Sequence, residues 1–178
     1  MNPAWEIQTG RLRLIPVNWQ DLPDLVSLKG DPGVYAQMLG GVAGPQRVAE
    51  ELARDTSFWA ARGVGMWMVR EGGAAVGLTG IHDRPDGRGL ALRFAFRPEA
   101  RGKGLGREAA GAGLRFAHDR AGLARVIAVA RQGNIASRTL LGSIGMRSFE
   151  TFLRDGEQVH VYESCAPTIS SPIDASWR

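Results

Sequence analysis

The sequence is poor in cysteine and histidine, with one cysteine (Cys165) and three histidines among its 178 residues. A single cysteine excludes an internal disulfide, and the spacing of these four residues does not match that of zinc ligands. No apolar run approaches the roughly 20 residues that a membrane-spanning helix needs. Residues 1–10 lack the basic segment and apolar stretch of a secretory signal. We therefore expect a cytoplasmic protein that binds neither a metal nor a membrane.

The charge is only mildly unbalanced. The formal net charge of +4 and the pI near 10.0 favour anionic ligands in general. The basic residues are scattered and form no tail or patch, so we expect no nucleic-acid partner; that alternative would predict salt-sensitive binding. Hydrophobic residues make up 44% of the chain and charged residues 22%, as in ordinary globular proteins. The pattern predicts one domain over residues 1–163 and a Ser/Pro-rich tail at residues 164–178.

The most informative stretch is a glycine-rich loop, RGKGLG at residues 101–106. It lies between an apolar, strand-like run at residues 90–96 and a helical pattern at residues 105–120. Glycines let a backbone approach a ligand closely and adopt positive φ. The unpaired N–H groups and the dipole of the following helix attract an anion. The loop therefore predicts a phosphate or pyrophosphate cradle, and the alternative is a flexible tight turn.

Two other nucleotide-binding loops fit this spacing less well. A Walker loop needs Ser or Thr after its Gly-Lys pair, whereas Lys103 is followed by Gly104. A dinucleotide fingerprint needs Gly-x-Gly-x-x-Gly in a first βαβ unit, whereas these glycines stand at 102, 104 and 106 in mid-chain. The loop does match the pattern Arg-x-x-Gly-x-Gly, which begins at Arg101.

Hydrophobic periodicity predicts the element order β-α-α-β-β-β-α-β-α-β-β. Turn signals at residues 71–73 and 85–87 join three strands into an antiparallel meander, and a crossover helix makes the next strand parallel to the last of them. The predicted fold class is α/β (α+β), a mixed sheet with helices on both faces. The predicted strands are residues 11–17, 66–69, 75–81, 90–96, 126–130, 149–153 and 158–163, and the predicted helices are residues 18–28, 45–61, 105–120 and 134–144.

In this order of elements and in three motifs, the chain resembles the GNAT superfamily of acyl-CoA-dependent N-acyltransferases over about residues 9–163. The glycine loop is the first motif. The second is the opening TGRLRL at residues 9–14, which is similar to the RimJ/RimL-like branch, whose members acetylate protein N-termini and small amines. The third is Asn134-x-x-Ser137-x-x-Leu140, closed by Gly145. The resemblance implies a mostly antiparallel sheet with splayed central strands, and a homodimer is possible.

The resemblance also implies acetyl-CoA as co-substrate, without a metal. Backbone groups at the end of the strand before the loop would pair with the pantetheine arm as an added strand does, and the loop N–H groups would hold the pyrophosphate. The asparagine would bond the pantetheine arm, and it is also a candidate helix cap. The implied coenzyme A contacts are Ala95, Phe96, Arg101, Gly102, Lys103, Gly104, Leu105, Gly106 and Asn134.

The resemblance suggests two catalytic residues. Ser137 would donate a proton to the leaving thiolate, although a first-turn serine can instead bond its own backbone. The tyrosine that often serves relatives as the acid is replaced by Leu141, and the carboxylate that often serves as the base is replaced by Ala91. His82, at the end of the preceding strand, is the nearest candidate base, and a chain of water molecules is an equal alternative.

The absence of a carboxylate at the position of Ala91 favours one class of acceptor amine. Freeing a lysine-like amine of pKa about 10.4 at pH 7 costs roughly 4.6 kcal/mol, whereas an α-amine of pKa near 8 costs only about 1.4 kcal/mol. We therefore expect the acceptor to be a protein N-terminus or an amine-bearing small molecule rather than a lysine side chain. The alternative function is a non-catalytic acyl-CoA sensor or regulatory module of the same fold.

Overall fold

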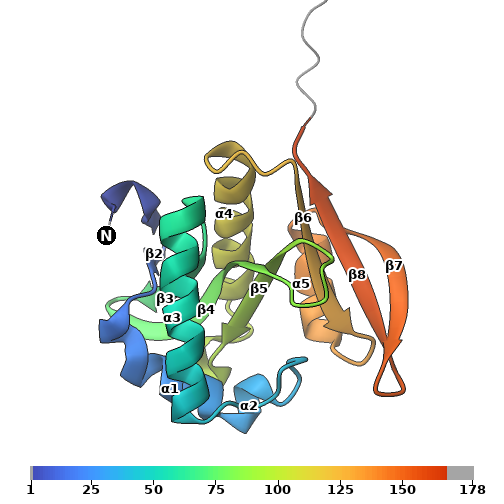
Figure 1. Ribbon diagram of the computed structural model, residues 1–178, viewed down its shortest axis with the longest axis horizontal. Coiled ribbons are helices and arrows are strands. Elements are labelled where there is room, and N and C mark those ends of the chain that lie inside the picture. The colour runs from blue at the N-terminus through green and yellow to red at the C-terminus, as the bar shows by residue number, and fades with distance from the viewer. Residues whose placement is uncertain (1, 168–178) are drawn as a thin grey trace, which may run out of the picture.

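The computed structural model describes residues 2–167, which form one eight-stranded sheet in the order β1-β2-β3-β4-β5-β6-β8-β7 (Figure 1). All neighbouring strands are antiparallel except β5 and β6, which are parallel. The predicted mixed, mostly antiparallel sheet is confirmed. The strands are β1 (Ile7–Gln8), β2 (Leu12–Pro16), β3 (Met66–Glu71), β4 (Ala74–Asp83), β5 (Leu90–Phe96), β6 (Arg125–Arg131), β7 (Arg147–Arg154) and β8 (Glu157–Cys165).

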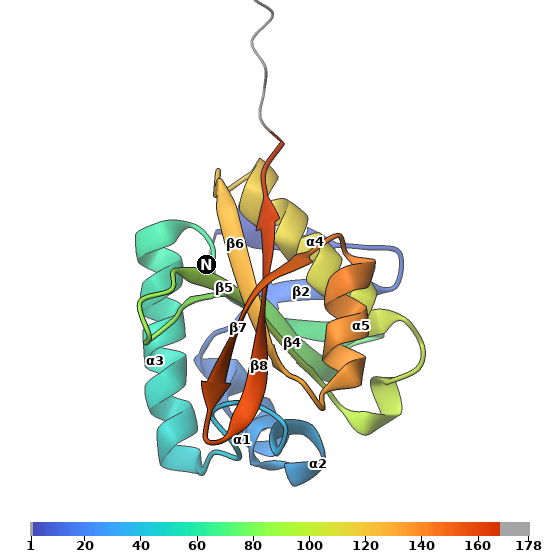
Figure 2. The ribbon, with the colours of Figure 1, turned by 90° about the vertical axis from the view of Figure 1, so that its right-hand side faces the viewer.

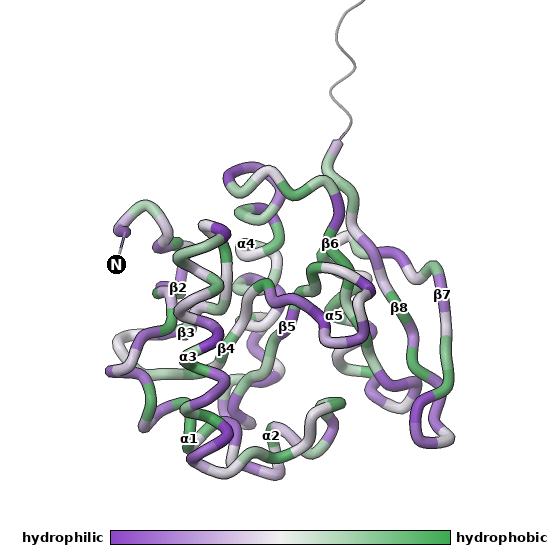
Figure 3. Tube along the Cα trace, viewed as in Figure 1, coloured by the Kyte–Doolittle hydropathy of each residue, from purple (hydrophilic) through white to green (hydrophobic). Residues whose placement is uncertain are grey.

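Helices cover both faces of the sheet, with α1 to α3 on one face and α4 and α5 on the other (Figure 2). In α3, hydrophilic and hydrophobic residues alternate along the trace as expected of an amphipathic helix (Figure 3). Residues with small side chains let α4 pack close to the sheet. A Cβ added to Gly113 would lie only 3.4 Å from the ring of Trp67. The helices are α1 (Leu22–Gly30), α2 (Pro32–Tyr35), α3 (Pro45–Arg62), α4 (Leu105–Asp119) and α5 (Ile135–Ser143).

Sequence periodicity missed the shortest strand, the two-residue β1, and the shortest α-helix, the four-residue α2. Neither is long enough to show a repeat. The helix predicted from residue 18 begins as a 3₁₀ turn, and Asn18 caps it, since its Oδ1 accepts from the N–H of Gln20 at 2.9 Å. The last strand extends to Cys165, and the rest of the expected tail, residues 168–178, lies outside the described residues. Among the described helices, none is both long and apolar enough to cross a bilayer.

The parallel strands β5 and β6 separate soon after they meet. They pair only at Ala91 and Ile127, whereas β4 and β5 pair along the whole of β5. Beyond this point the β5 edge that faces β6 has no strand partner. The sheet therefore opens into a wedge between its two central strands, and the functional side chains gather there.

Candidate active site

The glycine loop leads into α4 with its backbone donors free. Gly102 and Gly104 adopt φ of 72° and 75°, a region in which other L-residues are strained. The first intrahelical bond runs from the N–H of Glu108 to the carbonyl of Gly104, at 3.1 Å. Within the described part of the chain, the N–H groups of residues 102–107 have no hydrogen-bond acceptor. Free N–H groups at a helix N-terminus are suited to bind a phosphate.

The opening of the chain holds this loop in place. The Arg11 guanidinium donates through Nη1 to the carbonyl of Lys103 at 2.8 Å and through Nε to the Glu108 carboxylate at 2.7 Å. The Thr9 hydroxyl also donates to Glu108, at 2.6 Å. These bonds, that from Thr9 above all and then those from Arg11, lower the pKa of Glu108 below its usual 4.5. The opening motif, recognised in the sequence only as a family likeness, thus anchors the loop.

Three side chains of the loop, those of Arg101, Lys103 and Leu105, are not all directed toward the side of the loop where a ligand would bind. Arg101 donates through Nη2 to the carbonyl of Gly33 at 2.6 Å, tying α2 to the loop. Leu105 is fully buried in the core, and the Lys103 side chain is exposed. The Arg101 N–H donates to the carbonyl of Pro98 at 3.1 Å, so the N–H groups of Lys103 and Leu105, rather than the three side chains, are the groups best placed for an anion.

A groove of about 780 Å³ runs from the loop to the gap between β5 and β6. This volume is within the range of pockets that bury a sizeable ligand. Gly106 keeps the groove open, because a Cβ there would lie 2.9 Å from Leu140 Cδ1 and 3.4 Å from the ring of Phe96. Of the residues expected to bind or act, those that line the groove are Ala95, Phe96, Arg101, Gly102, Gly104, Gly106, Asn134 and Ser137.

The open edge of β5 offers backbone groups to the groove. Arg97 donates to the carbonyl of Val76 on β4 at 3.0 Å. Because bonding alternates along an antiparallel ladder, the odd-numbered residues of β5 face β4. Phe94 and Phe96 therefore turn their backbone groups toward the gap, while those of Ala95 face β4. Sequence analysis missed Phe94, since it could not tell which parity of the strand would face the gap.

Asn134 and Ser137 stand where the groove reaches the gap. The Asn134 Oδ1 caps α5 by accepting from the N–H of Ser137 at 3.1 Å. Within residues 2–167, neither the Asn134 amide nitrogen nor the Ser137 hydroxyl has a hydrogen-bond partner. The cap and a ligand contact are thus compatible at Asn134, and the serine hydroxyl is not occupied by its own helix.

A second, smaller pocket of about 90 Å³ opens on the other side of the gap. Both cavities are lined by Asn134 and Ser137, together with Gln37, Met38 and Phe94, so the groove and the inner pocket meet where these residues lie. His82 lies on the wall of the inner pocket and not in the groove. Sequence analysis missed the other polar residues of the inner pocket, among them Tyr35, Glu51 and Arg93.

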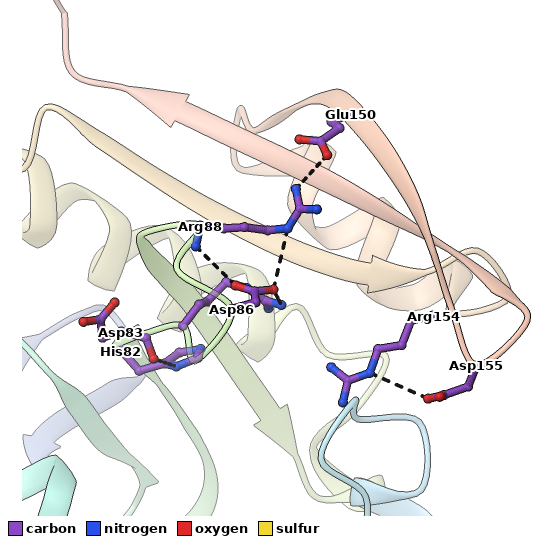
Figure 4. Close-up of polar contacts among 8 residues, drawn as sticks. His82, Asp83, Asp86, Arg88, Glu150, Arg154 and Asp155 are labelled. Carbon is purple, nitrogen blue, oxygen red and sulfur yellow. Dashed lines mark hydrogen bonds and ion pairs between the residues drawn. The ribbon is translucent and has the colours of Figure 1, made fainter.

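His82 lies beside the position of the missing carboxylate. It is the cross-strand partner of Ala91 in the β4–β5 ladder, and such partners project from the same face of a sheet. Its Nδ1 lies 3.0 Å from the carbonyl oxygen of Asp83 and donates to it (Figure 4), which leaves the Nε2 lone pair free. Burial, and then the charge of Arg93, lowers the pKa of His82 to about 3. The imidazole is therefore neutral and only weakly basic.

The loop between β4 and β5 closes this end of the pocket and is held to β7 (Figure 4). Arg88 donates through Nη1 to the Glu150 carboxylate at 2.6 Å, and its guanidinium lies 4.4 Å from the ring centre of Phe152. Arg84, which lines the pocket, forms an ion pair with Asp86 in the same loop. These contacts fix the position of the segment that follows His82.

A buried ion pair lies below the inner pocket. Lys29, 1% exposed, donates through Nζ to Glu51 Oε2 at 2.7 Å. Arg47 donates to the other carboxylate oxygen at 3.0 Å. The Lys29 and Arg47 bonds lower the pKa of Glu51 despite its burial. Glu51 is therefore a charge-compensated carboxylate rather than a free base.

We expect the substitution Lys29→Met to destabilise the fold by about 3 kcal/mol, because it leaves the buried Glu51 charge with one partner fewer. Urea denaturation monitored by circular dichroism measures this loss. Arg13→Met is the matched control, since Arg13 and its partner Glu6 are 60% and 43% exposed, and a change within about 0.5 kcal/mol is expected there. Equal losses in the two variants would contradict the stabilising role of the buried pair.

Comparisons with known proteins agree with this geometry. Residues 11–147 match the family model of the acetyltransferase (GNAT) domain. A GNAT-family structure from Bordetella pertussis superposes with a TM-score of 0.77 at 22% identity, covering 89% of this chain and 98% of that chain. An acetyltransferase from Agrobacterium tumefaciens gives 0.78 at 24% identity, covering 89% and 93%.

A third similar structure is RimL, described as a ribosomal L7/L12 α-N-protein acetyltransferase in complex with coenzyme A. Its TM-score is 0.75 at 14% identity, covering 90% of this chain and 98% of that chain. At such identities these likenesses show the fold alone. A comparison with curated proteins gives no match. Among the described residues, no three or more His, Cys, Asp or Glu side chains form a group that could hold a metal ion. With its family model matched over most of its length and its fold shared with these structures, the chain belongs to the GNAT acetyltransferase family.

Proposed function

We propose that the chain is an N-acetyltransferase that moves an acetyl group from acetyl-CoA to the α-amine of a small amino compound or a protein N-terminus, by direct attack. The observation that carries this proposal is the meeting of the groove and the inner pocket at Asn134 and Ser137. A donor in the groove and an amine in the pocket would come together there. The coenzyme A bound to RimL supports the choice of co-substrate.

The proposed roles in co-substrate binding follow from the free polar groups. The N–H groups of residues 102–107 would hold the pyrophosphate, and the turned-out backbone groups of Phe94 and Phe96 would pair with the pantetheine amides. The free amide nitrogen of Asn134 would donate to a carbonyl of the same arm. The Phe96 carbonyl already accepts from Arg101 Nε at 3.3 Å, whereas the other groups named here have no partner within the described residues.

The proposed chemistry needs no covalent intermediate on the protein. The neutral amine attacks the thioester carbonyl carbon, a C–N bond forms, and the C–S bond breaks. The attacking nitrogen loses one proton to water, and the leaving thiolate takes a proton from the Ser137 hydroxyl, which water restores. The His82 Nε2 lone pair would orient the amine by accepting a hydrogen bond from one of its N–H groups. With a pKa near 3, the imidazole would not retain the proton.

We expect no enzyme ionisation near pH 6.5 in the pH profile of kcat/KM. This profile reports groups of the free enzyme and free substrate, and His82, with a pKa of about 3, stays neutral above roughly pH 4. The rate should instead rise with pH through the ionisation of the acceptor amine, near 8 for an α-amine. An inflection between pH 5.5 and 7.5 that disappears in His82→Gln would contradict this assignment.

The test of the proposed function is acetyl-CoA-dependent thiol release with a panel of α-amino peptides, amino acids, polyamines and aminoglycosides. Turnover on α-amines is expected, and a clear preference for lysine ε-amines over α-amines would refute the acceptor class. Ala91 and the weakly basic His82 favour one second candidate, a non-catalytic acyl-CoA sensor. Tight acetyl-CoA binding without thiol release from any amine in the panel would support that candidate.

A further inference from the structure

Two buried polar atoms have no hydrogen-bond partner in the protein and mark a place where a ligand would supply one. Among the described residues, the buried side-chain polar atoms without any partner are the Tyr35 hydroxyl and the Arg131 Nε. Both residues line the inner pocket, and Tyr35 is only 4% exposed. A buried hydroxyl without a hydrogen bond is unfavourable. Its occurrence on the wall of a cavity points to a bound molecule that supplies the missing oxygen acceptor.

The same pocket contains a guanidinium that is not neutralised. Four arginines line it, and three of them form ion pairs: Arg47 with Glu51, Arg84 with Asp86, and Arg131 with Glu157. Within residues 2–167, the fourth, Arg93, forms no ion pair, and its side chain makes no hydrogen bond. It lies on β5, half-buried, and lines the same pocket as Tyr35 and His82. A free arginine beside a free tyrosine hydroxyl is a donor set for a carboxylate.

The charges around the pocket strengthen this reading. The positive charge of Arg93 acts to lower the pKa of Tyr35, Glu51, Asp55 and His82. Glu51 is the one carboxylate on the pocket wall in the described residues. Lys29 and Arg47 already neutralise it. The pocket is therefore positive overall and favours an anion over a cation.

We propose that the acceptor is a small amino carboxylate, such as a free α-amino acid, whose carboxylate is bound by Arg93 and the Tyr35 hydroxyl while its amine faces Ser137. This inference rests on the proposed function and names its substrate class. The cavity of about 90 Å³ is far below the ~300–1,000 Å³ of pockets for larger ligands, so it suits a molecule of this size. Peptide N-termini, which have an amide in place of the carboxylate, become the competing outcome of the test.

An arginine at this place would also assist the chemistry. The burial and the positive charge of Arg93 that keep His82 neutral likewise disfavour a bound ammonium group. An amino acid bound through its carboxylate would therefore release its amine proton to water more easily than in solution. The pocket would thus compensate in part for the carboxylate that is missing at Ala91, and direct attack by the neutral amine would follow.

The first experiment compares L-amino acids with their carboxamides, which match them in size and lack the negative charge. For the wild-type protein, kcat/KM is expected to be at least about tenfold higher for the acids, as charge-assisted hydrogen bonds would give. This comparison is stringent, because the carboxylate raises the pKa of the neighbouring amine, and intrinsic reactivity at neutral pH therefore favours the amide.

Two variants identify the groups responsible. Arg93→Gln is expected to raise KM for the acids at least tenfold, leave KM for acetyl-CoA unchanged, and bring the acid-to-amide ratio close to one. Tyr35→Phe is expected to raise KM for the acids several-fold while the melting temperature stays equal or rises, because the lost hydroxyl has no partner in the protein. A purely structural role for that hydroxyl would lower the melting temperature. Arg115→Gln, on the exposed side of α4, is the control.

Calorimetric titration of amino acids into the protein–coenzyme A complex separates this inference from the proposed function. Binding that is lost in Arg93→Gln, without turnover of any amine, would support the carboxylate site and refute the transferase. Turnover of amides and peptide N-termini as fast as of the acids would keep the transferase and overturn the carboxylate site. Equal effects of Arg93→Gln on acids and amides would overturn it as well.

Discussion

Replacing Gly106 with valine is expected to weaken acetyl-CoA binding by about 100-fold, or about 2.8 kcal/mol. A Cβ at this position would lie 2.9 Å from Leu140 Cδ1 and 3.4 Å from the ring of Phe96. Two further methyl groups must then push Leu140 aside or project into the groove. They would also cover the free N–H groups of the first turn of α4, which we propose to hold the pyrophosphate. Calorimetric titration with acetyl-CoA measures the loss.

Gly142→Val is the control for this substitution, because an added Cβ at Gly142 in α5 has no heavy atom within 4 Å. Both variants place valine in a helix, so their intrinsic effects on helix stability are similar. Melting temperatures check that both remain folded. Wild-type affinity in a folded Gly106→Val protein would show that the co-substrate does not bind in the groove.

Replacing Ser137 with alanine is expected to lower kcat by about 100-fold, the lower end of the range for a general acid. A thiol is a good leaving group, since its pKa is near 8.5, so a larger effect is not expected. The helix should remain intact, because the Asn134 cap bonds the backbone N–H of residue 137, which alanine keeps. KM for acetyl-CoA should change little if the hydroxyl acts mainly in the transition state.

Ser57→Ala is the control for the serine substitution. The Ser57 hydroxyl donates to its own helix, to the carbonyl of Ala53 at 2.9 Å, and Ser57 lines neither cavity. Thiol release should therefore remain at the wild-type rate in this variant. A Ser137→Ala protein with an unchanged kcat would assign protonation of the thiolate to water and leave the serine without a catalytic role.

The sequence by itself determined the features that depend only on residues close together along the chain. The backbone of residues 101–106 is specified locally, because glycine adopts the positive φ found at Gly102 and Gly104 with little strain. The three-residue interval between Asn134 and Ser137 places a cap and the N–H that it bonds at one helix end. Alternation of apolar residues, together with the turn signals, indicated the strands and a mixed sheet that contains an antiparallel meander.

Only the tertiary structure decided how the inner pocket is built. Tyr35, Glu51, His82 and Arg93 come from α2, α3, β4 and β5, and no sequence interval relates them. Strand register made His82 the neighbour of Ala91, and burial with the charge of Arg93 made its imidazole neutral. Register, desolvation and the fields of distant charges arise only when remote segments pack together. The sequence could therefore indicate the loop and groove that we propose for the co-substrate, whereas the chemistry proposed for the acceptor depends on the folded arrangement.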